Sequence, residues 1–223
     1  MVKPWADGPF KLLETPGHRN ARTGKTSITK NEEGAHKLAN VMALVHNVLI
    51  RGLNAIYLQA SNISLEQDIK DFCTFMYAWS LTLHAHHDNE ESLGFPFLEE
   101  MTGIQGLLDI NVQQHRLFDE GLKSFDLYVA SVKDGLAKYD GAHVRRLIDT
   151  LAPPLFEHLA AEESLEKRPP EMSGSCESQP ICLSCSGQVS VKVDGPSNPP
   201  PQVIFCRTLN YITLYTLLLA RIC

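Results

Sequence analysis

Residues 84–96 read HAHHDNEESLGFP, a stretch that concentrates histidines and two adjacent glutamates in one place. In an α-helix, side chains four residues apart project from the same face, so His86 lies beside Glu90 and His87 beside Glu91. Imidazole and carboxylate groups at this spacing suit a divalent transition metal. A solvated helix end rich in histidine and glutamate has the same composition, so the other helices must decide between the two interpretations.

Length and charge limit the classes of protein to consider. The 223 residues are enough for one domain with a sizeable core and a further segment. A net charge of −6 without a basic block argues against nucleic acid or an anionic membrane surface as a partner. The N-terminal sequence MVKPWADGPFKLLETPG lacks the apolar run and cleavage site of a secretory signal, so we expect a cytoplasmic protein with free thiols.

Four long runs show the three-and-four spacing of apolar residues that is typical of amphipathic helices. We expect the second run to end near Gly94-Phe95-Pro96, and Pro153-Pro154 to kink or restart the fourth. Four such runs with short connections predict an all-α, up-down-up-down four-helix bundle. The runs cover residues 31–60, 64–96, 107–129 and 144–165.

The two ends of the chain differ from the bundle. Residues 1–30 mix Pro, Gly and Thr without periodicity, which predicts an irregular N-terminal arm on the surface. The bundle itself is predicted over residues 31–166. Residues 167–223 turn to Pro, Ser and Gly, which predicts a mostly disordered tail, or an aberrant one that resembles translated non-coding sequence.

The tail contains two further features. Four of its cysteines could supply thiolates to zinc, although their spacing is unlike that of a typical zinc site. Its apolar end is shorter than the roughly 20 residues that span a bilayer, so a membrane interaction is not expected. The four cysteines are Cys176, Cys182, Cys185 and Cys206.

Each of the other three helical runs also places a histidine on its apolar face. A single histidine there is more often a core residue bonded to a carbonyl, but a bundle core offers few backbone acceptors for several of them. A metal would accept the imidazole lone pairs and neutralise the accompanying carboxylates. The residues on apolar faces are His46, His86 with Glu90, His115, and His158 with Glu162.

Four short motifs surround these histidines: ALVHNVLIRGLN, HHDNEESLGFP, QQHRLF and FEHLAAEE. Their order, a lone His, then HxxxE before FP, then His, then HxxxE, resembles the hemerythrin-like cation-binding proteins over residues 31–166. The arm sequence PWADGPFKLLETP and the motif around His46 are most similar to an intracellular, fungal-type branch of that family.

The resemblance implies a site for two iron ions (Fe2+/Fe3+), joined by an oxo or hydroxo bridge when oxidised. It implies that Glu90 and Glu162 are bridging carboxylates. The implied ligands are His46, His86, Glu90, His115, His158 and Glu162, and the neighbours that could substitute for a ligand or support one are His87, Glu91 and Glu163.

One position departs from the oxygen-carrying hemerythrins, which place two histidines four residues apart on the third helix. The residue four before His115 is Asn111. A site with fewer imidazoles and more carboxylate is harder, which favours ferric iron and argues against simple reversible oxygen carriage.

The expected function is therefore a non-haem di-iron-binding protein that handles iron, or binds or reacts with O2, NO or peroxide. The sequence assigns no catalytic residue, and oxidase-type chemistry is left open. Two alternatives are an iron- or redox-responsive binding module without catalysis and a metal-free structural bundle.

Overall fold

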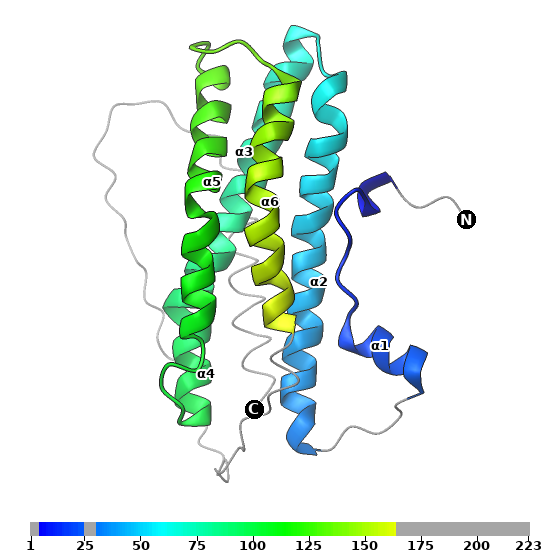
Figure 1. Ribbon diagram of the computed structural model, residues 1–223, viewed down its shortest axis with the longest axis vertical. Coiled ribbons are helices and arrows are strands. Elements are labelled where there is room, and N and C mark those ends of the chain that lie inside the picture. The colour runs from blue at the N-terminus through cyan, green and yellow to red at the C-terminus, as the bar shows by residue number, and fades with distance from the viewer. Residues whose placement is uncertain (1–4, 25–29, 164–223) are drawn as a thin grey trace, which may run out of the picture. The chain divides into compact units, whose positions relative to one another are not determined.

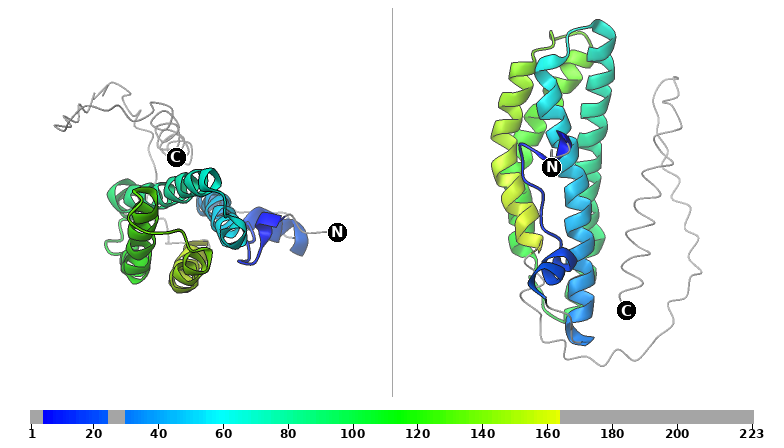
Figure 2. Two further views of the ribbon diagram at one scale, coloured as in Figure 1. Left: turned by 90° about the horizontal axis from the view of Figure 1, so that it is seen from above. Right: turned by 90° about the vertical axis from the view of Figure 1, so that its right-hand side faces the viewer.

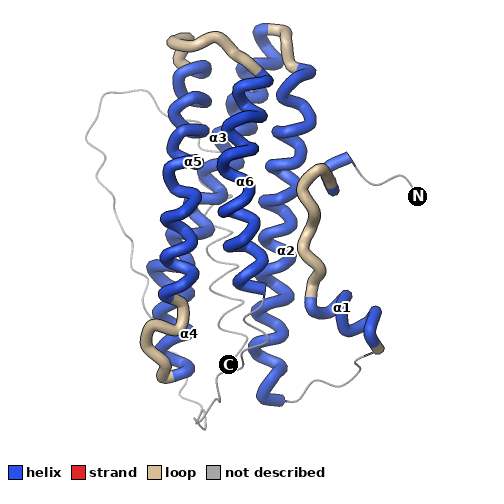
Figure 3. Tube along the Cα trace, in the orientation of Figure 1, coloured by secondary structure: helices blue, strands red, loops and turns tan. Residues whose placement is uncertain are grey.

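The computed structural model describes residues 5–24 and 30–163 of the chain (Figure 1). Within these ranges the protein is all helical, with no strand, which confirms the predicted fold class (Figure 3). The predicted tail at 167–223 lies outside the described residues. The four long helices are α2 (Lys30–Gln59), α3 (Glu66–Asn89), α5 (Asp109–Lys133) and α6 (Gly141–Glu163).

The four long helices run alternately up and down. Seen along its axis, the bundle has α2 beside α3 and α6, and α5 beside the same two helices (Figure 2). Apolar side chains from all four meet in the interior, where Leu53, Met76, Phe125 and Leu151 are almost completely buried. The helical stretch Gly34–Asn62 is long and apolar enough to cross a membrane, but half of its apolar 18-residue window is buried inside the bundle, as expected of a core helix.

Helices α2 and α3 approach closely around one aromatic side chain. The indole nitrogen of Trp79 donates a hydrogen bond to the carbonyl of Leu49 at 3.0 Å. A Cβ atom at Gly52 would lie 2.5 Å from the Trp79 ring, so only glycine leaves room for it there. This contact sets the spacing of the two helices less than two turns from His46.

The second helical run was predicted to end near Gly94-Phe95-Pro96, and that prediction was wrong. Helix α3 itself ends at Asn89, but helical structure continues to Thr102. The chain continues through a π-helical turn, η3 (Glu90–Gly94), into α4 (Phe95–Thr102), which ends at Gly103 with φ 69°. Pro96 stands in the first turn of α4, where a missing N–H costs little. The wider π turn accommodates the break that proline would cause inside an α-helix.

The prolines of α6 do not restart that helix. The helix runs without interruption from Gly141 to Glu163, through Pro153 and Pro154. The neighbouring Leu151 and Leu155 are fully buried, and their packing holds the helix across the lost hydrogen bonds.

The N-terminal arm is more regular than predicted. It contains a 3-10 turn, η1 (Trp5–Asp7), and an eight-residue helix, α1 (Pro16–Thr23). Thr15 caps α1 by accepting a hydrogen bond from the N–H of His18, and Pro16 occupies the first turn. A threonine followed by proline is a helix-start signal that does not depend on apolar periodicity.

Three asparagines spaced seven residues apart on α2 hold the arm in place. Asn54 accepts a hydrogen bond from the N–H of Phe10 and donates to the carbonyls of Ala6 and Phe10. Asn47 makes the same two-way pairing with Leu13. The arm therefore runs antiparallel to α2 and lies along it (Figure 2). The third asparagine, Asn40, accepts from the N–H of Gly17.

Replacing Asn54 by alanine is expected to lower the free energy of unfolding by about 1–3 kcal/mol. The reason is that the N–H of Phe10 and the carbonyls of Ala6 and Phe10 would lose their hydrogen bonds to the Asn54 side chain. Chemical denaturation measures the change. The matched control is Asn62→Ala, since the exposed Asn62 side chain bonds only to the carbonyl of Leu58 one turn earlier. Equal losses in the two variants would show that Asn54 does not anchor the arm.

Candidate metal centre

Every long helix contributes polar side chains to one level of the bundle interior. They are nearly sealed from solvent, with each residue between 0 and 8% exposed. So many buried imidazole and carboxylate groups are unusual in an apolar core. The residues are His46 on α2, His86 and His87 on α3, Glu90 at the start of η3, His115 on α5, and His158 and Glu162 on α6.

The first donor group consists of His46, His86, Glu90 and Glu162. The Nε2 atoms of His46 and His86 lie 3.0 Å apart. Nε2 of His86 lies 3.0 Å from Oε1 of Glu90, and Nε2 of His46 lies 3.3 Å from Oε2 of Glu162. One donor atom from each of the four residues thus faces a common centre.

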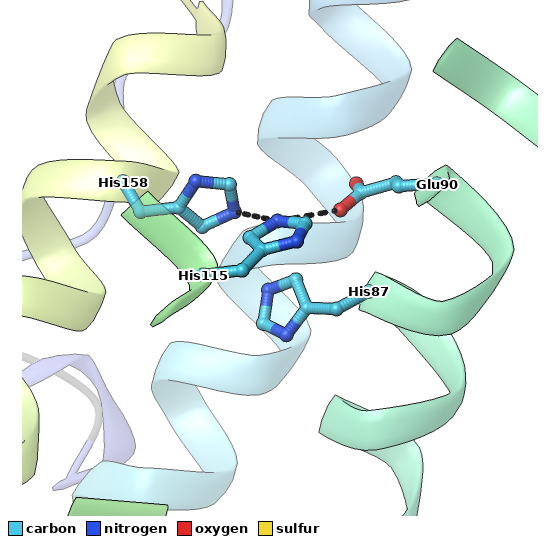
Figure 4. A group of neighbouring side chains, drawn as sticks. All are labelled: His87, Glu90, His115 and His158. Carbon is cyan, nitrogen blue, oxygen red and sulfur yellow. Dashed lines mark hydrogen bonds and ion pairs between the residues drawn. The ribbon is translucent and has the colours of Figure 1, made fainter. Parts of the chain in front are cut away.

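The second donor group consists of His87, Glu90, His115 and His158 (Figure 4). Nε2 of His115 lies 3.1 Å from Nε2 of His158 and 3.5 Å from Oε2 of Glu90. The His87 ring packs against the other two, with its centroid 4.4 Å from that of His115. Glu90 belongs to both groups and turns one oxygen toward each.

The spacing of the nitrogens fits a metal ion. Imidazole nitrogen binds a first-row metal such as zinc at about 2.0–2.1 Å, so two nitrogens at right angles around one ion lie about 3 Å apart. The Nε2 atoms are separated by 3.0 Å in the first group and 3.1 Å in the second. Both groups are therefore compatible with an ion without a large rearrangement.

Several of the donor atoms are buried without a hydrogen-bond partner. Both oxygens of Glu90, Oε2 of Glu162 and Nε2 of His87 are buried and make no hydrogen bond within the described part of the chain. A buried polar atom without a partner costs about 1–3 kcal/mol, and more if it is charged. A cation placed among these atoms would satisfy all of them, so the residues fit a metal.

Burial sets the protonation state of the histidines. Desolvation is the main cause that lowers the pKa of His86 to about 3 and that of His158 to about 4. Desolvation and the neighbouring imidazoles hold the pKa of His87 well below its usual range. These rings are neutral near pH 7 and keep a lone pair available, which is the form that binds metals.

The two carboxyl groups are shifted in opposite directions. Desolvation, together with the charge of Glu162, raises the pKa of Glu90 well above its ordinary value. Desolvation also acts to raise the pKa of Glu162, but the close approach of His46 and the charges of His158 and His46 outweigh it and lower that pKa. The two carboxyl groups thus differ in their affinity for a proton, and a cation placed between them would neutralise both.

The structure brings all six residues of the predicted ligand set together, and it adds His87, which was predicted only as a possible substitute or supporting neighbour. The phase of α3 placed His87 off the apolar stripe, yet it is buried in the second donor group. Glu91 is 46% exposed at its side chain and lies behind His115, with Oε1 2.6 Å from Nδ1. The side chain of Glu163 lies outside the described residues. Asn111, singled out as a departure, is buried at the site.

Fold and site together define a helical bundle with a buried, cation-binding set of histidines and glutamates. The chain belongs to the hemerythrin family: the domain described as the Hemerythrin HHE cation binding domain matches residues 37–167. A similar protein is the dimeric xanthone biosynthesis cluster protein R11 of Cryptosporiopsis sp. (strain 8999), 34% identical over 163 residues. That match covers 73% of this chain and 59% of the relative's length. No solved structure matches significantly.

The stability of the metal-free protein should depend on pH. In the folded state the pKa values of His86 and His158 are about 3 and 4, below the ordinary value of 6.5. At a pH between the folded-state and the ordinary value, each of these histidines is neutral in the folded protein and protonated in the unfolded chain. The free energy of unfolding should therefore fall as the pH drops from 6.5 toward 4, by up to about 1.4 kcal/mol per histidine and pH unit. Denaturant titrations in the presence of chelator measure this slope. A double variant, His86→Gln with His158→Gln, should flatten it, and a flat wild-type profile would contradict the account.

Proposed function

We propose that this protein is a non-haem di-iron-binding hemerythrin-like protein that handles iron or binds or reacts with O2, NO or peroxide. The observation that carries the proposal is that two buried donor groups share one carboxylate, Glu90. Mixed imidazole and carboxylate donors suit iron better than the harder magnesium and calcium or the softer copper(I).

Each residue has a definite role in this proposal. His46, His86 and Glu162 would hold one ion, and His87, His115 and His158 the other, with Glu90 joining the two. When bound, ferrous ions would supply electrons and exchangeable coordination positions for a small oxidant. The nearly complete burial of the donors supports a ligand the size of a diatomic molecule or peroxide, because a larger molecule would not reach them in this arrangement.

Glu91 supports this site as a positioning residue. Its carboxylate accepts a hydrogen bond from Nδ1–H of His115, which fixes the tautomer and leaves Nε2 with a lone pair directed at the second donor group. Because its side chain is half exposed, Glu91 also connects the buried imidazole to solvent.

Replacing Glu91 by alanine should weaken metal binding at the second donor group by roughly 10- to 100-fold, the usual effect of losing a carboxylate behind a metal-binding histidine. Competition with a chromophoric chelator gives the affinity. Asp88→Ala, a carboxylate on an exposed residue of the same helical segment, is the control. If both variants bind metal like the wild type, Glu91 has no role in the site.

The proposal as a whole is tested by the iron content of untagged protein, followed by the optical spectrum after air oxidation. We expect about two irons per chain with ferric charge-transfer bands, and loss of iron in both His46→Ala and His158→Ala, because each removes a ligand from a different donor group. His18→Ala, on the exposed arm, should keep its iron. If neither bundle variant loses metal, the metal-binding function fails.

A second candidate is an iron- or redox-responsive binding module without catalysis. It is favoured by the unpaired buried atoms, because a metal that satisfies them couples its own binding to the stability of the bundle. Thermal melting with iron and with chelator separates the candidates: a sensor requires a large shift, whereas an oxygen-reactive site also requires oxygen uptake by the reduced protein.

The relative is named for a xanthone biosynthesis cluster, and we propose on that ground that this chain, too, acts in a biosynthetic setting. We treat this as part of the proposal, since the chain spans about 59% of that relative's length.

A further inference from the structure

Asn111 is the polar residue of the site that the proposed function does not use. It lies on α5 one turn before His115, on the same face, and only 5% of the residue is exposed. A carboxamide in this position cannot offer the nitrogen lone pair that an imidazole would. Burying it nevertheless costs free energy unless its polar atoms are used.

The partner of Asn111 is one particular oxygen of Glu162. Nδ2 of Asn111 donates to Oε1 of Glu162 at 3.3 Å. A carboxylate only accepts hydrogen bonds, so the amide must present its NH2 group to it. The other oxygen, Oε2, lies 3.3 Å from Nε2 of His46 and thus belongs to the first donor group.

The oxygen held by Asn111 is the one that faces the second donor group. Oε1 of Glu162 lies 3.9 Å from Nε2 of His158, farther than Oε2 lies from His46. The first donor group therefore has two carboxylates at close range, whereas the second has three imidazoles and the single oxygen of Glu90. The two donor groups therefore differ in the number of carboxylates. Asn111 binds Oε1 of Glu162, the oxygen that would have to move for the second group to gain a carboxylate.

We propose that Asn111 is a positioning residue that keeps Glu162 in the first donor group and makes the second metal position weaker and more exchangeable. The inference rests on the proposed metal function. For Glu162 to serve both positions, Oε1 has to leave the amide of Asn111, so the hydrogen bond opposes occupation of the second position. The substitution Asn111→Ala would remove this hydrogen bond and leave Oε1 of Glu162 free to turn toward the second donor group.

Cobalt(II) is the probe, because its visible absorption reports ligand number and geometry and its titration against a competing chelator gives two dissociation constants. The wild type should bind in two steps, the second weaker. Asn111→Ala should tighten the second step by roughly tenfold, the value of one hydrogen bond to a charged acceptor, and leave the first within about twofold. Its second-step spectrum should change, and Gln113→Ala, an exposed residue of the same helix, should match the wild type.

Asn111→Leu keeps nearly the size of the side chain while removing the donor and adding no metal ligand, so it tests the same step if the alanine variant does not fold. It should also tighten the second step. A second step that is unchanged or weaker in both variants overturns the inference, as does a wild type whose two steps are equal. A merely structural role would instead weaken both steps together and lower the melting temperature. If the wild type binds no cobalt at His46 and His158, the proposed function itself fails.

Discussion

The burial of two carboxyl groups among five imidazoles is the constraint on which the rest of this structure depends. Glu90 and Glu162 lie on different helices, and removing both from water is unfavourable unless positive charge or hydrogen-bond donors compensate. In the folded chain the imidazoles and the amide of Asn111 provide part of that compensation. The oxygens of Glu90 make no hydrogen bond within the described part of the chain, so the rest of the compensation would have to come from a cation.

The helical scaffold is built to hold these groups at one level. Trp79 and Gly52 fix the approach of α3 to α2, and the asparagines of α2 bind the arm along the outside of the same helix. The π turn begins at Glu90, the residue that both donor groups share, and π turns inside helices frequently occur at functional sites. A rigid surround of this kind is what keeps ligands at bonding distance before an ion arrives.

Much of this could be predicted from helix periodicity, because His46, His115 and His158 repeat with the apolar residues of their own helices and therefore face the core. His87 could not be placed this way. Its neighbour His86 follows the stripe, and one residue of phase is within the uncertainty of any helical projection. The π turn was missed because the rule that proline ends a helix describes α-helical interiors, not a first-turn proline after a wider turn. The contact of Asn111 with Glu162 joins residues 51 apart in the sequence and depends on the packing of α5 against α6.

We propose that the two donor groups each hold one metal and share Glu90. The most direct measurement is a crystal structure of the iron-loaded protein with anomalous diffraction recorded at the iron edge. The account predicts two anomalous peaks inside the bundle, one bonded to His46 and His86 and the other to His115 and His158, with Glu90 contacting both. A single peak, or iron bound only outside these residues, would contradict it.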